Sequence, residues 1–272
     1  MAAPARVLIV AGSDSGGGAG IQADIKTVTA LGGYAATAIT ALTAQNTRGV
    51  FGVVGVEPKF IQRQMRVVLE DIGADAVKTG MLHSAAVIEA VREVLDATDT
   101  ALPVVVDPVM VAQSGDSLLD PGAVASLIDH LLPRATVLTP NAPEAERLSG
   151  LPVHDLAGMI DAAKRLSAMG PGAVLVKGGH VPGATVVDVL AVGAAIETFA
   201  SPRIETPHTH GTGCTLASAI ATGLAQGLDV RAAVVRARAY LQEAIRTAPG
   251  LGRGHGPVNH GHTVRPFAGP EN

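Results

Sequence analysis

The sequence has few of the residues on which nucleic-acid binding depends. It contains no tryptophan, two tyrosines and four phenylalanines, and 24 aspartates and glutamates outnumber 20 lysines and arginines, which gives a formal net charge of -4. Few rings are therefore available to stack on bases, and no basic surface is indicated. The composition favours neither RNA nor DNA as a partner.

Cysteine and long apolar runs are also scarce. The one cysteine, Cys214, cannot form a disulfide within the chain, which is typical of proteins in a reducing cytoplasm. The N-terminal apolar run from Val7 to Ala11 is broken by Gly12 and is too short for a signal peptide or a membrane span. We therefore expect a cytoplasmic protein with no membrane partner.

The chain does have enough apolar sequence for a large core. Of its 272 residues, 47% are hydrophobic and 16% are charged, which favours one α/β domain over two small ones. No repeat or linker marks a boundary, so residues 1–272 are predicted to form a single domain with a Gly-, Pro- and His-rich tail from about residue 250. The tail histidines His255, His260 and His262 lack the companion ligands of a zinc site, and a loose tail with surface histidines is expected.

Alternating strand and helix patterns predict the fold class. Short apolar segments end at glycine, proline or polar loops, and helical patterns follow them, as in βαβ units. Strands are predicted at 6–11, 35–42, 50–56, 74–77, 102–106, 136–138, 173–177, 185–191 and 194–199, the last two as an antiparallel hairpin. Helices are predicted at 21–31, 58–72, 84–95, 155–169, 214–226 and 229–247, with others from Pro121 and Pro143. This order indicates a doubly wound, mainly parallel sheet of roughly eight to ten strands, with helices on both faces and ligands at the carboxyl edge.

Two further expectations concern local structure. The helix at 58–72 is amphipathic, and its inward face is predicted to comprise Phe60, Ile61, Met65, Val68 and Leu69. The segment 43–49 is predicted to be a polar loop at the carboxyl end of the second strand.

The glycine-rich loops do not match the common nucleotide-binding signatures. The loop at 12–20 lacks the G-x-G-x-x-G spacing because position 21 is Ile, and no Gly-Lys pair occurs in the chain. A dinucleotide fingerprint and a Walker A loop are both absent, so any nucleotide must be bound in another way.

The stretch from His208 to Ala219 is the best candidate for an anion site. Gly211, Thr212 and Gly213 lead directly into an apolar helical pattern, so backbone amides at the positive end of the helix dipole are free to bind phosphate oxygens. Cys214 lies at the N-terminus of this helix, a position that lowers the pKa of a thiol, and it is a candidate base near neutral pH. An ordinary glycine-rich helix entry with a small buried cysteine explains the spacing equally well.

Several polar residues follow predicted strands, where ligands of doubly wound sheets bind. Asp107 and Lys177 end two such strands, and the flexible segment 113–117 after Asp107 has the composition of a closing flap. Asn141 and Glu144 are spaced to face one site, although Glu144 also suits the first turn of a helix.

Three residues near the other strand ends are candidates for the substrate side. Asp24 lies on the first helix, Gln45 offers an amide, and Met81 follows a short strand. Taken alone, each has a common structural explanation: a solvated first-turn carboxylate, a polar loop residue and a core methionine.

Taken together, the loops resemble those of one enzyme family. The segments that carry the resemblance are AGSDSGGGAGIQADIKT at 11–27, ITALTAQNTRG at 39–49, KTGM at 78–81, DPVM at 107–110, TPNAPE at 139–144, VKGGH at 176–180 and HGTGCTL at 210–216. They are similar to the hydroxymethylpyrimidine/phosphomethylpyrimidine kinases of thiamine biosynthesis, and the similarity extends over nearly the whole chain.

The resemblance implies a ribokinase-like fold and a homodimer. It also implies transfer of the γ-phosphoryl group of ATP, with Mg²⁺, to the hydroxymethyl group of 4-amino-5-hydroxymethyl-2-methylpyrimidine, and then to the resulting monophosphate. Phosphoryl transfer depends on positioning and charge stabilisation more than on covalent catalysis, which suits the residues present.

Residue roles follow from the same resemblance. Gly211, Thr212 and Gly213 form the anion hole beside ATP. Lys177 neutralises ATP phosphate charge, and Cys214 takes the position of the aspartate base of related sugar kinases. The residues implied to arrange Mg²⁺ are Asp107, Asn141 and Glu144. The residues implied to line the pyrimidine pocket are Asp24, Gln45, Met81 and Val109.

Two alternatives remain open. A pyridoxal kinase shares the fold and motifs, and some relatives use a second cysteine in the flap, which this chain lacks. A non-catalytic regulator that binds nucleotide or pyrimidine is expected to have lost the base or the metal carboxylates, which are present here.

Overall fold

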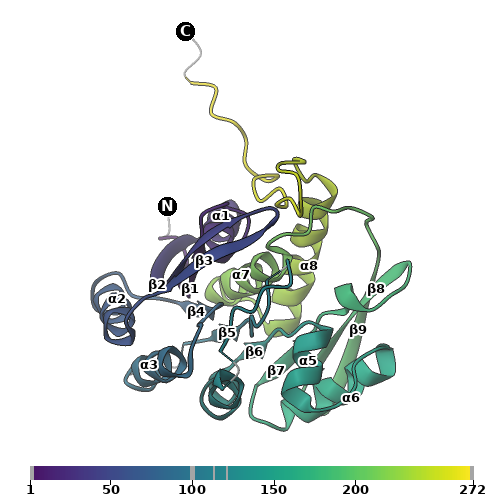
Figure 1. Cartoon of the computed structure of the whole chain (residues 1–272), viewed down its shortest axis with the longest axis horizontal. Helices are drawn as coiled ribbons and strands as arrows, with labels where there is room; N and C mark the ends of the chain where they lie inside the picture. Colours follow the sequence, from purple (N-terminus) through teal and green to yellow (C-terminus); the bar gives the residue numbers. More distant parts are fainter. Residues whose placement is uncertain (1–2, 99–101, 113, 121, 270–272) are drawn as a thin grey trace.

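The computed structural model describes residues 3–98, 102–112, 114–120 and 122–269. Across these residues a nine-stranded sheet forms the centre of the molecule, with strand order β3-β2-β1-β4-β5-β6-β7-β8-β9 (Figure 1). Six neighbouring strands, from β2 to β7 in that order, are parallel, while β3 and the pair β8 and β9 add antiparallel edges. The predicted doubly wound, mainly parallel sheet is confirmed.

The strand bounds are close to those expected from the apolar runs. The strands are β1 (Arg6–Asp14), β2 (Tyr34–Asn46), β3 (Gly49–Gly55), β4 (Ala76–Thr79), β5 (Val104–Val106), β6 (Val137–Leu138), β7 (Ala173–Val176), β8 (Thr185–Val192) and β9 (Ala195–Pro202). The antiparallel hairpin predicted for the last two strands is confirmed.

Helices cover both faces of the sheet. They are α1 (Gly20–Ala30), α2 (Pro58–Asp71), α3 (Ala85–Asp96), α4 (Ala123–Ser126), α5 (Ala142–Ser149), α6 (Leu156–Ser167), α7 (Thr212–Ala225) and α8 (Val230–Arg246). A π-helical turn (Leu127–Leu131) and a 3-10 turn (Leu132–Arg134) continue α4, and a further 3-10 turn (Gly178–His180) follows β7. Pro121, where one helix was predicted to begin, lies outside the described residues.

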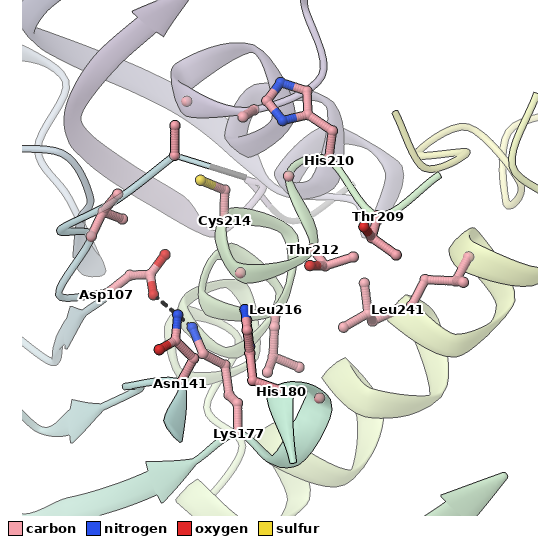
Figure 2. A pocket seen from close by; sticks show the side chains of 18 of the residues that line it. Asp107, Asn141, Lys177, His180, Thr209, His210, Thr212, Cys214, Leu216 and Leu241 are labelled. Atoms are coloured by element: carbon pink, nitrogen blue, oxygen red, sulfur yellow. Dashed lines mark hydrogen bonds and ion pairs between the residues drawn. The ribbon is translucent and has the colours of Figure 1, made fainter. Parts of the chain in front are cut away.

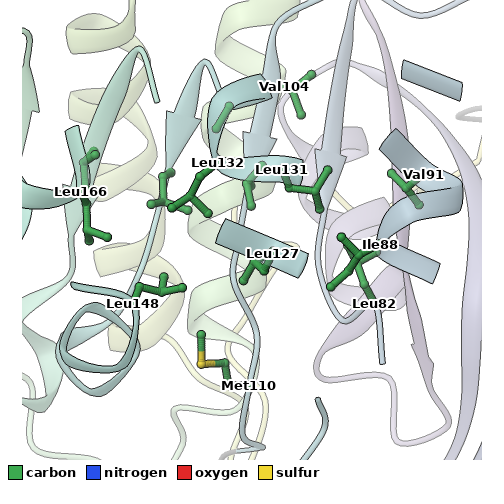
Figure 3. Packing of buried hydrophobic residues seen from close by; sticks show 14 of the residues in the cluster. Leu82, Ile88, Val91, Val104, Met110, Leu127, Leu131, Leu132, Leu148 and Leu166 are labelled. Atoms are coloured by element: carbon green, nitrogen blue, oxygen red, sulfur yellow. The ribbon is translucent and has the colours of Figure 1, made fainter. Parts of the chain in front are cut away.

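Alternation along β1 shows how the two cores form. Val7 and Ile9 pack with α1, α7 and α8 on one face, whereas Leu8 and Val10 pack with α2 to α6 on the other. Successive strand side chains point to opposite faces, so a continuous apolar run serves both layers. Figure 3 shows part of the second core, where Leu131, Leu132 and their neighbours fill the space between strands and helices.

The N-cap residues expected from the sequence are present at the start of three helices. Ser84, Asp155 and Asp229 each cap a helix by accepting a backbone N–H bond, as predicted. The inward face predicted for α2 was wrong at one position, since Phe60 is 53% exposed while Ile61 and Met65 are fully buried. The buried pair is spaced i, i+4, and Phe60 falls beside that stripe.

The predicted loop at 43–49 is mostly strand. β2 continues to Asn46 because residues from Ala41 onward pair antiparallel with β3, so Gln45 lies on a β-hairpin. The polar side chains led to the loop prediction, but they are polar because this hairpin extends beyond the buried parallel strands and is partly exposed.

The C-terminal segment is not a loose tail over residues 251–264. Val258 and His260 are buried, Tyr240 donates a hydrogen bond of 2.5 Å to the His260 carbonyl, and Thr215 Oγ1 lies 3.0 Å from His260 Nε2. Burial lowers the pKa of His260 to about 4. His255 is exposed, as expected, and no group of three or more His, Cys, Asp or Glu side chains placed to hold a metal ion occurs among the described residues.

No helix in the described ranges is both long enough and apolar enough to cross a membrane.

Candidate active site

A cavity of about 400 Å³ opens at the carboxyl ends of the parallel strands (Figure 2). Its lining includes the ends of β1 and β2, the segments after β4 to β7, the start of α7 and one side of α8. The predicted site residues that line it are Gln45, Met81, Asp107, Val109, Asn141, Glu144, Lys177, Gly211, Thr212, Gly213 and Cys214. The position of the cavity agrees with the carboxyl-edge prediction.

The start of α7 is open to an anion. Gly211 is the N-cap with φ of 82°, and a Cβ there would lie 1.9 Å from the Gly18 carbonyl oxygen, so only glycine fits. Thr212 donates to the Thr209 carbonyl, and no acceptor in the described part of the chain takes the amides of Gly213 and Cys214. These two amides are the free donors expected at a helix N-terminus.

Asp107 and Lys177 face each other beside this helix (Figure 2). Their Oδ1 and Nζ atoms are 3.0 Å apart. Burial alone would lower the pKa of Lys177, but the Asp107 and Glu144 carboxylates raise it above its ordinary value, so the lysine keeps its charge. A Cβ placed on Gly213 would lie 3.2 Å from Lys177 Nζ, which puts this cation directly next to the helix N-terminus.

Asn141 and Glu144 form a capping box at the start of α5. The Asn141 side-chain oxygen accepts from the Glu144 amide at 2.9 Å, and Glu144 Oε2 accepts from the Asn141 amide at 2.8 Å. Glu144 therefore caps the first turn of α5 and also lines the cavity, so the helix-start role and the site role considered for it both apply. Burial, with the Asp107 charge nearby, raises the pKa of Glu144 to about 7 although Lys177 opposes the shift.

One oxygen of this group has no protein partner. Asp107 Oδ2 is buried and accepts no hydrogen bond from any residue the structure describes. Mg²⁺ in phosphoryl-transfer sites takes one or two carboxylates and fills its other positions with water and substrate phosphates. Asp107 and Glu144, with the side chain of Asn141, therefore fit a magnesium site, and would leave the remaining positions of the ion to water and phosphate oxygens.

The lowered pKa predicted for Cys214 was wrong. Burial, reinforced by the Asp24 and Asp107 charges, raises the pKa of the Cys214 thiol to about 12 despite the nearby Lys78. Desolvation exceeds the helix dipole here, which screening normally limits to a small effect. A thiol with this pKa is protonated at neutral pH, so it is not a ready base.

Asp24 does not line the cavity, contrary to the sequence prediction. It is fully buried, with Lys78 Nζ 2.9 Å from its carboxylate and Ser218 Oγ donating at 2.7 Å. The side chain points from α1 toward β4 and α7 rather than over the sheet edge. Lys78 was missed as its partner, although a lysine inside a short apolar strand was the available signal.

The acceptor side of the cavity contains two residues that the sequence did not single out. His210 Nε2 lies 2.9 Å from Asp14 Oδ2 and 3.2 Å from Gln45 Nε2. Met81 and Val109, which the resemblance assigns to the pyrimidine pocket, also line the cavity. Asp14 and His210 both lie in segments that carry the family resemblance, 11–27 and 210–216, and this was the available signal.

The other side of the cavity was not predicted at all. It is formed by α8 and by the segments at β8 and β9, and its apolar residues are Val186, Ile204, Leu241 and Ile245. No local pattern marks these positions, because they meet only when the C-terminal helix packs back onto the sheet.

The segment predicted to be a flap packs on the β2–β3 hairpin. Asp116 Oδ2 accepts from the Val50 amide at 3.1 Å and from Ser114 Oγ at 2.7 Å. Val111, Ala112 and Leu118 line the cavity beneath it, while Gln113 lies outside the described residues.

A family model for phosphomethylpyrimidine kinase matches residues 14–259. The chain belongs to this family. A hydroxymethylpyrimidine/phosphomethylpyrimidine kinase of Streptomyces coelicolor is 50% identical over 258 residues, covering 95% of each chain. The thiamine biosynthesis bifunctional protein ThiED of Geobacter sulfurreducens is 57% identical over 254 residues; the match covers 93% of this chain but only 52% of that protein, so the chain spans about half its length.

Solved structures agree on the fold. A Staphylococcus aureus pyridoxal kinase in complex with ADP superposes with a TM-score of 0.90 at 36% identity, covering 97% of this chain and 96% of that one. The phosphomethylpyrimidine kinase of Clostridium difficile 630 gives a TM-score of 0.78 at 42% identity, covering 88% and 99%. The family resemblance seen in the sequence and the ribokinase-like fold are thus confirmed.

Proposed function

We propose that the chain is an ATP-dependent kinase that phosphorylates 4-amino-5-hydroxymethyl-2-methylpyrimidine and then its monophosphate. The main support is a single cavity. It joins the open N-terminus of α7, beside Lys177 and Asp107, to a pocket lined by Gln45, Met81 and Val109. A phosphate donor and a small acceptor bound there would meet at Gly213 and Cys214. Family membership supports the choice of substrate.

The residues near α7 bind the phosphates of ATP in this proposal. The amides of Gly213 and Cys214 and the Lys177 ammonium stabilise the charge on the transferred group. Asp107, Asn141 and Glu144 would hold a magnesium ion, which would supply neutralisation of phosphate charge. The apolar side chains from α8 and β8 give the nucleoside a dry wall, and a related kinase has been solved with ADP.

Cys214 contacts the acceptor alcohol as a protonated thiol in this proposal. Its raised pKa argues against an early proton transfer to sulfur. A loose phosphoryl-transfer transition state requires little removal of the nucleophile's proton before the phosphorus–oxygen bond to ADP breaks, and the proton then passes to an oxygen of the transferred phosphoryl group as the new phosphorus–oxygen bond forms. Positioning of the hydroxyl in line with the phosphoryl group is then the main contribution of this side of the site.

A phosphorylation assay with three acceptors tests the function. The purified protein, ATP and Mg²⁺ are supplied with the pyrimidine alcohol, its monophosphate or pyridoxal, and ADP release and product mass are measured. Phosphorylation of the first two, more efficiently than of pyridoxal, is expected. Preferred phosphorylation of pyridoxal would support the pyridoxal kinase alternative. This alternative is worth testing because several similar structures, at 34 to 36% identity, are pyridoxal kinases. No turnover with any acceptor would favour a binding protein.

Glu144→Gln should weaken the magnesium dependence without unfolding the protein. The amide oxygen can still accept the Asn141 N–H, so the cap is kept, while the charge offered to the metal is lost. We expect the Mg²⁺ concentration for half-maximal activity to rise about tenfold. An unchanged Mg²⁺ titration would contradict the role of Glu144 in metal binding.

The same variant has a predicted pH signature in stability. The folded pKa of Glu144, about 7, is above its ordinary value of 4.5, so the folded state binds this proton more tightly. Glu144 therefore costs stability progressively as pH rises from 4.5 to about 7, and the cost persists above that. Glu144→Gln should have a Tm at about pH 8 at least as high as the wild type, with the advantage lost near pH 4.

We also propose that the chain forms a homodimer through the β2–β3 hairpin. Leu42, Phe51 and Val54 are 50%, 70% and 67% exposed, and Leu42 pairs directly across the hairpin with Val54. Exposed apolar side chains gathered on one element are typical of an interaction surface.

Light scattering tests the dimer. Val54→Glu should convert a dimer to a monomer, since a buried unpaired charge is costly at an interface. Leu156→Glu, at a 42% exposed apolar position on α6, is the matched control and should leave the dimer intact. A monomeric wild-type protein would contradict the proposal.

The cytoplasmic location stays a prediction. It is supported by the single cysteine, which is a free thiol in the structure.

A further inference from the structure

Three polar side chains from distant parts of the chain meet beside the acceptor pocket. Asp14 ends β1, Gln45 lies near the end of β2, and His210 directly precedes the N-cap of α7. His210 Nε2 is 2.9 Å from Asp14 Oδ2 and 3.2 Å from Gln45 Nε2. Gln45 is the residue proposed to contact the pyrimidine, so this cluster has a direct bearing on substrate choice.

Asp14 is held in its ionised form. Its carboxylate accepts from the amides of Gly16 at 2.7 Å, Gly18 at 3.0 Å and Ala19 at 2.8 Å, and it also faces His210. Burial works against the charge, but these bonds together hold the pKa of Asp14 below its ordinary value. An ionised carboxylate only accepts hydrogen bonds, so His210 Nε2 must carry a proton directed at Asp14.

This proton fixes the orientation of the Gln45 amide. A protonated Nε2 has no lone pair for an N–H group of Gln45, so the amide oxygen must face the imidazole instead. The two ends of a glutamine amide have nearly the same shape, and the hydrogen-bond network decides between them. The amide NH₂ is then the end directed away from His210, toward the cavity that Gln45 lines.

We propose that the Asp14–His210 pair acts as a positioning device that turns the Gln45 NH₂ group toward a ring nitrogen of the aminopyrimidine. The inference rests on the proposed function, because it assigns a specificity role within the same acceptor pocket. The amide oxygen keeps a second lone pair for the neighbouring amino group of the substrate, so Gln45 presents a fixed donor and acceptor pattern.

Close packing keeps His210 in place. A Cβ on Gly18 would lie 2.4 Å from His210 Cδ2, so glycine is required opposite the imidazole. The His210 amide donates to the Gly256 carbonyl at 3.1 Å, which ties this residue to the C-terminal segment. A side chain restrained on two sides is suited to orient a neighbour, because little conformational freedom is left to lose when substrate binds.

The test compares the pyrimidine alcohol with an analogue in which the ring nitrogen beside the amino group is replaced by CH. The wild type should prefer the pyrimidine by about tenfold or more in kcat/KM, since the analogue leaves a buried NH₂ without an acceptor. His210→Phe keeps a ring but removes the N–H, so Gln45 can turn over and the preference should fall to about threefold or less. His210→Gln restores an N–H donor near the position of Nε2 and should restore most of the preference.

Three controls separate positioning from general damage. The KM for ATP should stay within about twofold in His210→Phe, and His210→Phe should add little in a Gln45→Leu background, because the two residues act through one contact. His154→Phe, an exposed histidine remote from the cavity, should behave as the wild type. Gln45→Glu offers no N–H and should lose the preference, which tests the Gln45 contact itself. If His210→Phe does not fold, Asp14→Asn tests the positioning, because it removes the carboxylate that holds the His210 proton and should also lower the preference.

Several results would overturn the inference. One is an unchanged preference for the pyrimidine over the analogue in His210→Phe or Gln45→Glu. Another is an equal loss of kcat/KM on both acceptors in His210→Phe together with a raised KM for ATP, which would show that His210 is only structural. A wild type that phosphorylates the pyrimidine but does not distinguish the analogue overturns the inference and leaves the proposed function standing. A wild type that phosphorylates neither acceptor overturns the proposed function itself.

Discussion

Iodoacetamide should alkylate Cys214 roughly a thousandfold more slowly at neutral pH than it alkylates an unperturbed cysteine. The thiolate is the reacting species, and a pKa of about 12 instead of the ordinary 9.0 lowers the thiolate fraction by about three orders of magnitude. Partial shielding of the sulfur adds to the effect. Because Cys214 is the only cysteine in the chain, mass spectrometry of the intact protein measures its rate directly.

The denatured protein is the control for this measurement. In guanidinium chloride the thiol should react at the rate of a free cysteine, which shows that the folded environment causes the protection. A folded-state rate equal to or faster than the free rate would show that the helix dipole and Lys78 dominate over burial. That result would restore Cys214 as a candidate base near neutral pH.

Asp24→Leu should destabilise the fold by about 3–5 kcal/mol, or more than a hundredfold in the unfolding equilibrium. The substitution leaves the Lys78 ammonium buried without its hydrogen-bonded counter-charge, since both side chains are fully buried and 2.9 Å apart. Burial alone would lower the pKa of Lys78, and Asp24 is the main group that raises it above its ordinary value, so Asp24→Leu removes the main compensation for burying the ammonium. Chemical denaturation measures the loss.

The double variant Asp24→Leu, Lys78→Met separates the pair from its surroundings. It should recover most of the lost stability, because two apolar side chains of similar size replace two desolvated charges. The exposed pair Arg231–Glu197 provides a matched control, and Glu197→Leu should change stability little. A small effect of Asp24→Leu alone, or no recovery in the double variant, would contradict the importance of this buried pair.

Much of the fold followed from local pattern. Apolar runs such as Val7 to Ala11 identify buried parallel strands, and Ser84, Asp155 and Asp229 cap the helices where the sequence places them. Parallel strands joined by right-handed crossovers bring all their carboxyl ends to one edge. The order of elements therefore predicted that residues such as Asp107, Asn141 and Lys177 would share one cavity.

The sequence was less informative where a side chain's environment depends on distant segments. Gln45 was placed in a loop because its neighbours are polar, and only pairing with β3 makes that segment a strand. The C-terminal histidines looked like surface residues, yet His260 is buried against Thr215 and Tyr240. Contacts of this kind leave no periodic signal in the chain.

The sequence by itself determined the sheet, its layers, the glycine-marked helix entry at Gly211 and the family. Only the tertiary structure decided that Asp24 pairs with Lys78 instead of lining the pocket, that the Cys214 thiol is protonated, and that His210 joins Asp14 to Gln45. The physical reason is that periodicity and turn residues are properties of neighbouring positions, whereas desolvation and charge pairing depend on which side chains meet after the helices pack on the sheet.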